Sequence, residues 1–133
     1  MSISRRVLLG LSAVVLMCGF SAQAQADVRG NSYDVFVRSF RNAFPDVFTF
    51  EAGIRRNSGK FIAEGGGEGE WEQTKYGPIS VWTAYFEDED FRVDFSGIQY
   101  EDLIFATGLS SEGTQFLITP PPEAPPPPTA AAY

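Results

Sequence analysis

The chain has 133 residues and a formal net charge of −7, from 10 basic and 17 acidic residues. It contains no histidine and one cysteine, Cys18, which excludes histidine-based catalytic triads and metal sites built on imidazole or thiolate. An acidic surface repels phosphate, so we expect no nucleic acid as a partner.

Residues 1–26 are predicted to be a cleaved signal peptide. Arg5 and Arg6 precede an apolar run over residues 7–20, and Ala24 and Ala26 each end a small-x-small cleavage site. The run is shorter than the roughly 20 residues that span a bilayer, so we expect no integral membrane segment after cleavage. The arginine pair resembles a twin-arginine export signal, and an ordinary general-secretion signal is the alternative. We therefore expect a periplasmic or secreted bacterial protein.

Residues 27–119 are predicted to form a single domain that begins with a helix over residues 31–44. The apolar side chains in this segment recur at helical spacing, and Pro45 follows where a helix would end. This stripe, which we expect to pack on a sheet, consists of Tyr33, Phe36, Val37, Phe40 and Phe44.

The rest of the domain alternates with a period of two, which indicates strands. Its clearest unit is a hairpin over residues 79–95, in which Phe91, Val93 and Phe95 share the inward face. Further strands are expected at 46–54, 61–74, 103–107 and 114–119, with the glycine-rich run 65–69 making a bulge or bend in the second of these. We therefore predict a mainly β fold: one N-terminal helix packed on an antiparallel meander of about six strands, as a small barrel or a sandwich.

Residues 120–133 are predicted to be a proline-rich disordered tail. Seven of the nine residues from Pro120 to Pro128 are proline, which cannot pair in a sheet and favours an extended polyproline II conformation. The tail is interpreted as a stiff spacer, and a ligand for a proline-binding groove is the alternative.

Four aromatic residues that lie close together in the sequence are candidate ligand-binding residues: Trp71, Tyr76, Trp82 and Tyr85. On a curved sheet they could line a pocket for an apolar ligand. The alternative is that they belong to the hydrophobic core, with Trp71 and Tyr76 the two that are partly exposed.

Four consecutive acids, Glu87, Asp88, Glu89 and Asp90, lie between the strands of the central hairpin. We call them the acidic tip. They offer oxygen ligands to Ca²⁺ but lack the spacing of a calcium-binding loop, so we interpret them as a solvated turn and leave the metal question open. No cofactor is expected.

Three functions remain open from the sequence. The first is a binding or interaction module of the bacterial envelope, with an apolar small molecule or a protein as its partner. The second is a structural accessory subunit that docks on a larger assembly. The third is a small enzyme that depends on carboxylate or tyrosine side chains, which the lack of histidine and of a large cleft disfavours.

Overall fold

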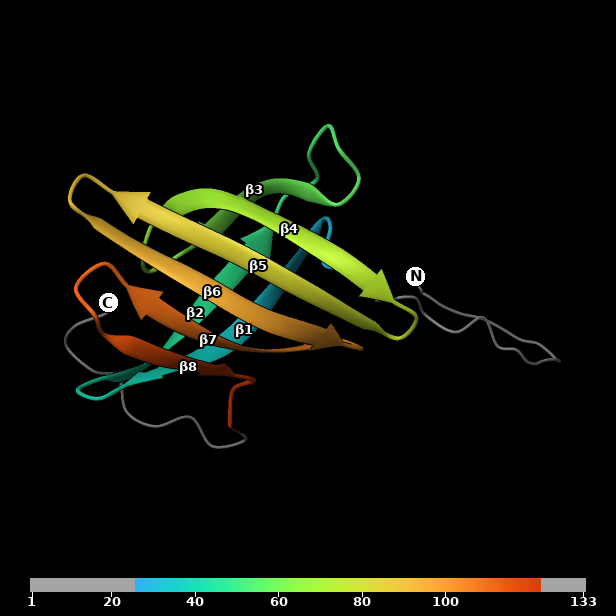
Figure 1. Cartoon of the computed structure of the whole chain (residues 1–133). Helices are drawn as coiled ribbons and strands as arrows, with labels where there is room; N and C mark the ends of the chain where they lie inside the picture. The colour runs from blue at the N-terminus through green and yellow to red at the C-terminus, as the bar shows by residue number, and fades with distance from the viewer. Residues whose placement is uncertain (1–25, 123–133) are drawn as a thin grey trace, which may run out of the picture.

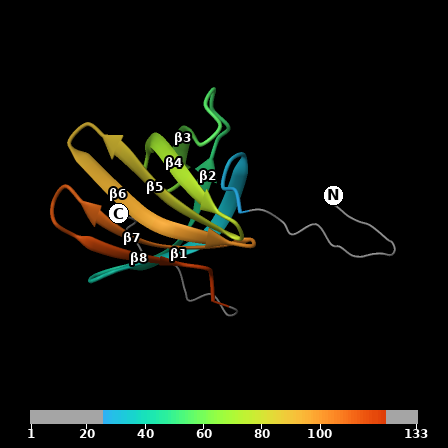
Figure 2. The ribbon, with the colours of Figure 1, turned by 45° about the vertical axis from the view of Figure 1, so that its right-hand side comes forward.

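A computed structural model describes residues 26–122, and this part of the chain forms an antiparallel β-barrel (Figure 1, Figure 2). Each strand pairs with the next along the chain, and β8 returns to pair with β1 and close the barrel. The strands are β1 (Asn31–Ser39), β2 (Ala43–Phe50), β3 (Ser58–Ala63), β4 (Glu68–Tyr76), β5 (Ile79–Asp88), β6 (Phe91–Tyr100), β7 (Leu103–Ser110) and β8 (Gln115–Thr119). The prediction of a mainly β antiparallel meander is confirmed, and of the two architectures left open the barrel is the observed one.

The predicted helix over residues 31–44 is wrong, because this segment forms β1 and the start of β2. Tyr33, Val35 and Val37 alternate into the barrel, and β-branched valines favour a strand. Phe40, which the helical stripe required on a buried face, lies in the β1–β2 turn and is 94% exposed. Apolar residues at every second or third position fit both the period of a helix and the period of a strand. Only the pairing of this segment with β2 and β8 selects the strand.

The predicted count of about six strands is also wrong. Residues 61–74 form two strands rather than one, because glycines 65–67 make the turn between β3 and β4 instead of a bulge. A Cβ at Gly66 would stand 2.5 Å from the ring of Phe86, so the turn needs glycine for that ring to close over the barrel interior. This extra strand, together with β1, brings the count to eight.

The predicted central hairpin is confirmed and corresponds to β5 and β6. Asp88 pairs with Phe91, which leaves Glu89 and Asp90 as a two-residue turn. Val93 and Phe95 are buried as expected, Phe91 packs against the core, and Arg92 is exposed.

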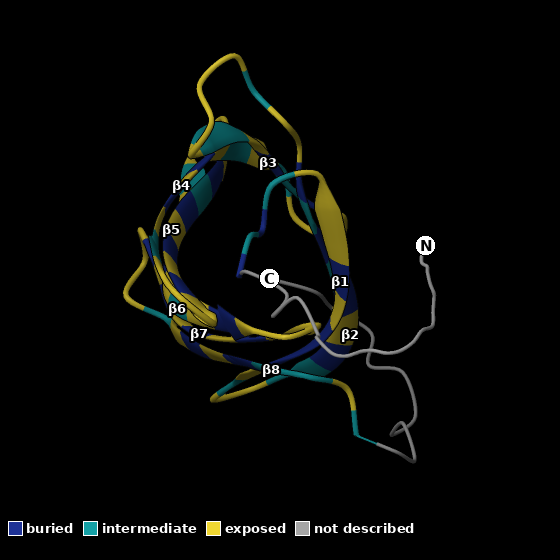
Figure 3. Cartoon of the chain, turned by 90° about the vertical axis from the view of Figure 1, so that its right-hand side faces the viewer, coloured by how far each residue is buried: buried dark blue, intermediate teal, exposed yellow. Residues whose placement is uncertain are grey.

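The hydrophobic core fills the middle of the barrel, so that each strand is buried on one face and exposed on the other (Figure 3). The largest side chains with under 2% exposure are aromatic: Trp71, Trp82, Phe48, Phe50, Phe61, Phe86 and Phe95. Burial of each such side chain stabilises the fold by about 1.5–3 kcal/mol, and the described chain has no disulfide to assist.

The predicted signal peptide and most of the predicted tail lie outside the described residues, so both stay predictions. No helix between residues 26 and 122 has the length and apolar character needed to cross a bilayer.

Candidate functional site

The four candidate ligand-binding aromatics lie on opposite sides of the barrel wall. Trp71 and Trp82 point inward and are 1% and 0% exposed, whereas Tyr76 is 63% exposed and Tyr85 lies partly exposed on the outer face. Tyr76 is therefore exposed as predicted, and the expectation that Trp71 is partly exposed is wrong. Since the wall separates the two tryptophans from the two tyrosines, the four residues do not line one pocket.

Aromatic rings occupy the interior around the tryptophans. The ring of Phe50 lies 5.1 Å from that of Trp82 and 6.0 Å from that of Trp71, both in edge-to-face geometry. Phe48 lies 5.1 Å from Phe61 and closes the same cluster. These separations are those of packed ring pairs, so this part of the barrel interior holds side chains where a ligand would otherwise sit.

A polar network closes the end of the barrel that faces the viewer in Figure 3, where the chain enters β1. The buried amide of Gln73 accepts hydrogen bonds from the Val28 N–H (3.0 Å) and the Ser80 hydroxyl (2.7 Å), and donates one to the Asp27 carboxylate (2.7 Å). Lys75 forms a 3.3 Å ion pair with Asp27. These contacts hold the N-terminal segment in the opening, which gives the network a structural role.

Asp27 shows how this network affects ionisation. Partial burial alone would raise the pKa of its carboxyl group, but hydrogen bonds from Gln73, the Arg29 backbone and Lys75 outweigh burial and lower that pKa. Inside the barrel, burial raises the pKa of Tyr33 to about 12, so its phenol stays neutral at physiological pH.

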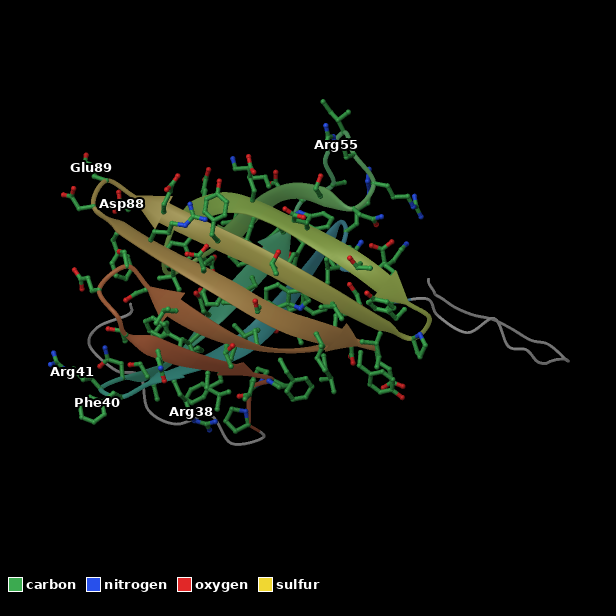
Figure 4. All side chains as sticks on the ribbon, in the orientation of Figure 1. Arg38, Phe40, Arg41, Arg55, Asp88 and Glu89 are labelled. Carbon is green, nitrogen blue, oxygen red and sulfur yellow. The ribbon has the colours of Figure 1, made fainter. Side chains whose placement is uncertain are left out.

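The acidic tip lies at the opposite end of the barrel and points into solvent, as the labelled Asp88 and Glu89 show (Figure 4). Beside it, Arg92 forms a charge-assisted pair with Asp94 at 2.8 Å, and its guanidinium stacks 3.8 Å from the ring centre of Tyr85. Among residues 26–122, no three His, Cys, Asp or Glu side chains are grouped so as to hold a metal ion. The interpretation of the tip as a solvated turn stays a prediction.

The outer wall formed by β4, β5, β6 and β7 carries a feature that sequence reasoning missed. At the end of this wall near the β4–β5 and β6–β7 turns, two neighbouring rows of outward side chains are almost entirely apolar. Strand register aligns Tyr76, Ile79, Tyr100 and Leu103 in the first row, and Thr74, Val81, Ile98 and Phe105 in the second. We call the apolar members of these rows, all at least 37% exposed, the apolar band: Tyr76, Ile79, Val81, Ile98, Tyr100, Leu103 and Phe105.

The character of the wall changes in steps along the strands. The next row holds Glu72 on β4 and the hydroxyl side chains Thr83, Ser96 and Thr107, which we call the hydroxyl band. Beyond it lies a mixed row of Glu70, Tyr85, Asp94 and Leu109, and the acidic tip lies at the far end. Apart from Leu109 on β7, the exposed apolar side chains of this wall are thus concentrated at one end.

One signal of the apolar band is present in the sequence. Residues 81–82 and 103–106 are apolar at successive positions rather than alternate ones, so both faces of these strand segments are apolar. We expected the hairpin to end at residue 95, but β6 continues to Tyr100. Position 97 needs glycine because a Cβ there would clash with the carbonyl oxygen of Phe105 and would stand 2.9 Å from the buried ring of Trp82.

Compared with protein-family models, with curated proteins and with solved structures, the chain matches none of them.

Proposed function

We propose that this protein is an interaction module of the bacterial envelope, which binds a protein partner through the apolar band on the outer wall of its barrel. The observation that carries the proposal is the band itself: seven exposed apolar side chains gathered on four adjacent strands. Contiguous exposed apolar surface is uncommon on soluble monomers and marks interaction sites. A partner of matching chemistry presents a flat apolar surface with polar groups at its margin.

The interior of the barrel supports this use of the outer wall over a ligand-holding role. An apolar small molecule would have to displace the packed rings of Phe50, Phe61 and Trp82, each of which is fully buried. Opening such a core costs several kcal/mol for each large side chain that is displaced. The structural accessory subunit is a special case of the same proposal, because it would dock through the same band.

Site-specific photo-crosslinking in the host bacterium tests the proposal. A photoreactive residue at Ile98, in the middle of the band, is expected to yield a covalent adduct with a protein. The same residue at Asp34, which is exposed on the outer face of β1, should yield none. Equal adducts from both positions, or none from Ile98, would contradict the proposal.

The proposed location has a separate test. Sequencing the N-terminus of the exported protein is expected to find Gln25 or Asp27, the residues that follow the two cleavage sites. A start at Gln25 keeps Ala26, whose side chain is buried and whose N–H donates to the Gly77 carbonyl at 3.2 Å. Material that begins at Met1 would contradict export.

A further inference from the structure

We infer that the partner of the apolar band is a basic protein, whose apolar contact surface is bordered by lysine or arginine side chains. The inference rests on the proposed function and adds the chemical class of the partner. Charge complementarity between two facing surfaces selects one partner over another and speeds their encounter. The distribution of charge over the barrel therefore indicates which kind of surface the apolar band meets.

The net charge of the barrel is confined to the wall that carries the apolar band. Residues 68–110, which form β4–β7, contain 10 acidic and two basic residues, a formal net charge of −8. The remaining described residues, 26–67 and 111–122, contain six acidic and six basic residues and carry no net charge. All of the acids in β4–β7 and their turns are exposed. This wall is therefore the acidic face of an otherwise neutral barrel.

Three of these acids lie directly at the margins of the apolar band. Glu72 lies on β4 in the row that contains the hydroxyl band, next to the second apolar row. Glu101 and Asp102 form the β6–β7 turn, next to the first apolar row. None of the three forms an ion pair with another residue between 26 and 122. Their carboxylates are therefore available to cationic side chains of a partner, which bind carboxylates through charge-assisted hydrogen bonds.

The positions of these margins describe the surface that fits. Successive rows on one face of a strand are about 7 Å apart, so the two margins, which are three rows apart, are separated by about 20 Å. A matching surface has basic side chains about 20 Å apart along the strand direction, with apolar side chains between them. A partner without these basic groups would cover the margin carboxylates and remove their water without replacing it.

The acids farther along the wall act at longer range. Glu70 lies two rows, or about 14 Å, from the second apolar row, and the acidic tip lies farther away. These distances exceed the Debye length of about 8 Å at physiological ionic strength, so salt screens these acids from a partner on the band. At low ionic strength their field extends over the band and attracts a cationic partner. Binding is therefore expected to weaken as salt is added, which an apolar contact without charges does not do.

Photo-crosslinking in the host bacterium from a photoreactive residue at Ile98 tests the inference in two variants. The first variant neutralises the three margin acids: Glu72→Gln, Glu101→Gln and Asp102→Asn. The matched control neutralises three exposed acids outside the wall: Asp34→Asn, Glu64→Gln and Glu112→Gln. The margin variant is expected to lower the yield of the protein adduct about tenfold, because three exposed charge pairs are lost together. The control should leave the yield unchanged, and thermal melts followed by circular dichroism establish that both variants are folded.

Salt gives a second measurement on the unmodified sequence. In extracts of the cell envelope, the yield of the Ile98 adduct is expected to fall about tenfold between about 50 and 500 mM NaCl. Mass spectrometry of the adduct identifies the crosslinked surface of the partner, which should carry an excess of lysine and arginine around its apolar contact.

The outcomes separate the inference from the proposed function. A protein adduct whose yield responds neither to the margin variant nor to salt overturns the inference and leaves the proposed function standing. Equal losses in the margin variant and the control also overturn it. An adduct between two copies of this chain overturns it as well, because a second copy brings the same acidic wall. The lack of any protein adduct from Ile98 contradicts the proposed function and the inference with it.

Discussion

Val93→Asp tests the register on which the arrangement of both faces of the wall depends. Val93 is completely buried, pairs with Phe86 on β5 and lies next to Phe95 along the inner face. The substitution loses about 2 kcal/mol of apolar burial and adds about 3 kcal/mol for a buried carboxyl group without a partner. The total of about 5 kcal/mol is comparable with the whole stability of a domain of this size.

The variant should therefore melt at least about 20 °C below the unmodified protein, or be unfolded at room temperature. Circular dichroism and urea titration measure this directly. Burial raises the folded-state pKa of the new aspartate, so its destabilising effect is complete above that raised pKa and decreases as the pH falls through it. A variant that regains stability near pH 4 relative to pH 7 identifies desolvation of the charge as the cause.

Two controls separate burial from charge. Val93→Thr keeps the shape without the charge and should cost about 1–2 kcal/mol. Arg92→Ala changes the neighbouring outward side chain and should cost less than about 1 kcal/mol, because its ion pairs are exposed. If Val93→Asp melts within about 5 °C of the unmodified protein, residue 93 faces solvent and the register is displaced by one residue.

Three further predictions concern the two ends of the barrel. Gly66→Ala should destabilise the fold by about 1–3 kcal/mol in urea titration, because its Cβ would stand 2.5 Å from the buried ring of Phe86, whereas Gly65→Ala makes contacts of 3.4 Å or more and should be close to neutral. Because Asp27 has a lowered pKa, its contribution to stability is present above the ordinary value of 3.8 and is lost as the pH falls through the lowered one. Asp27→Asn should thus be less stable than the unmodified protein at pH 7 and lose less stability on acidification, and parallel curves of unfolding free energy against pH would contradict this. Replacing both aspartates of the acidic tip by asparagine should leave the melting temperature unchanged or slightly higher, and Ca²⁺ should shift it no more than NaCl of equal ionic strength; a Ca²⁺-specific shift abolished by the substitutions would indicate a metal site.

The sequence alone determined the class of the fold and the clearest of its hairpins. From Trp82 to Phe95 the inward positions of β5 and β6 are apolar while the acidic tip interrupts the pattern, so period, turn and register all agree. Strand alternation is a local property and can be recognised without knowledge of partners. The same approach misassigned residues 31–44 as a helix, because their apolar positions fit a helical period and a strand period equally well. The pairing partners that decide between the two lie up to about 85 residues away on β8.

Only the tertiary structure decided which aromatic residues are core and which are surface. Trp71 and Tyr76 lie on the same strand, but an odd separation places them on opposite faces, and the closed wall then buries one and exposes the other. The apolar band likewise depends on the alignment of four strands, since Tyr76 and Leu103 come into one row only through the registers of β5 and β6. A surface patch is a property of neighbours in space, and a barrel brings those neighbours together from positions that the sequence keeps apart.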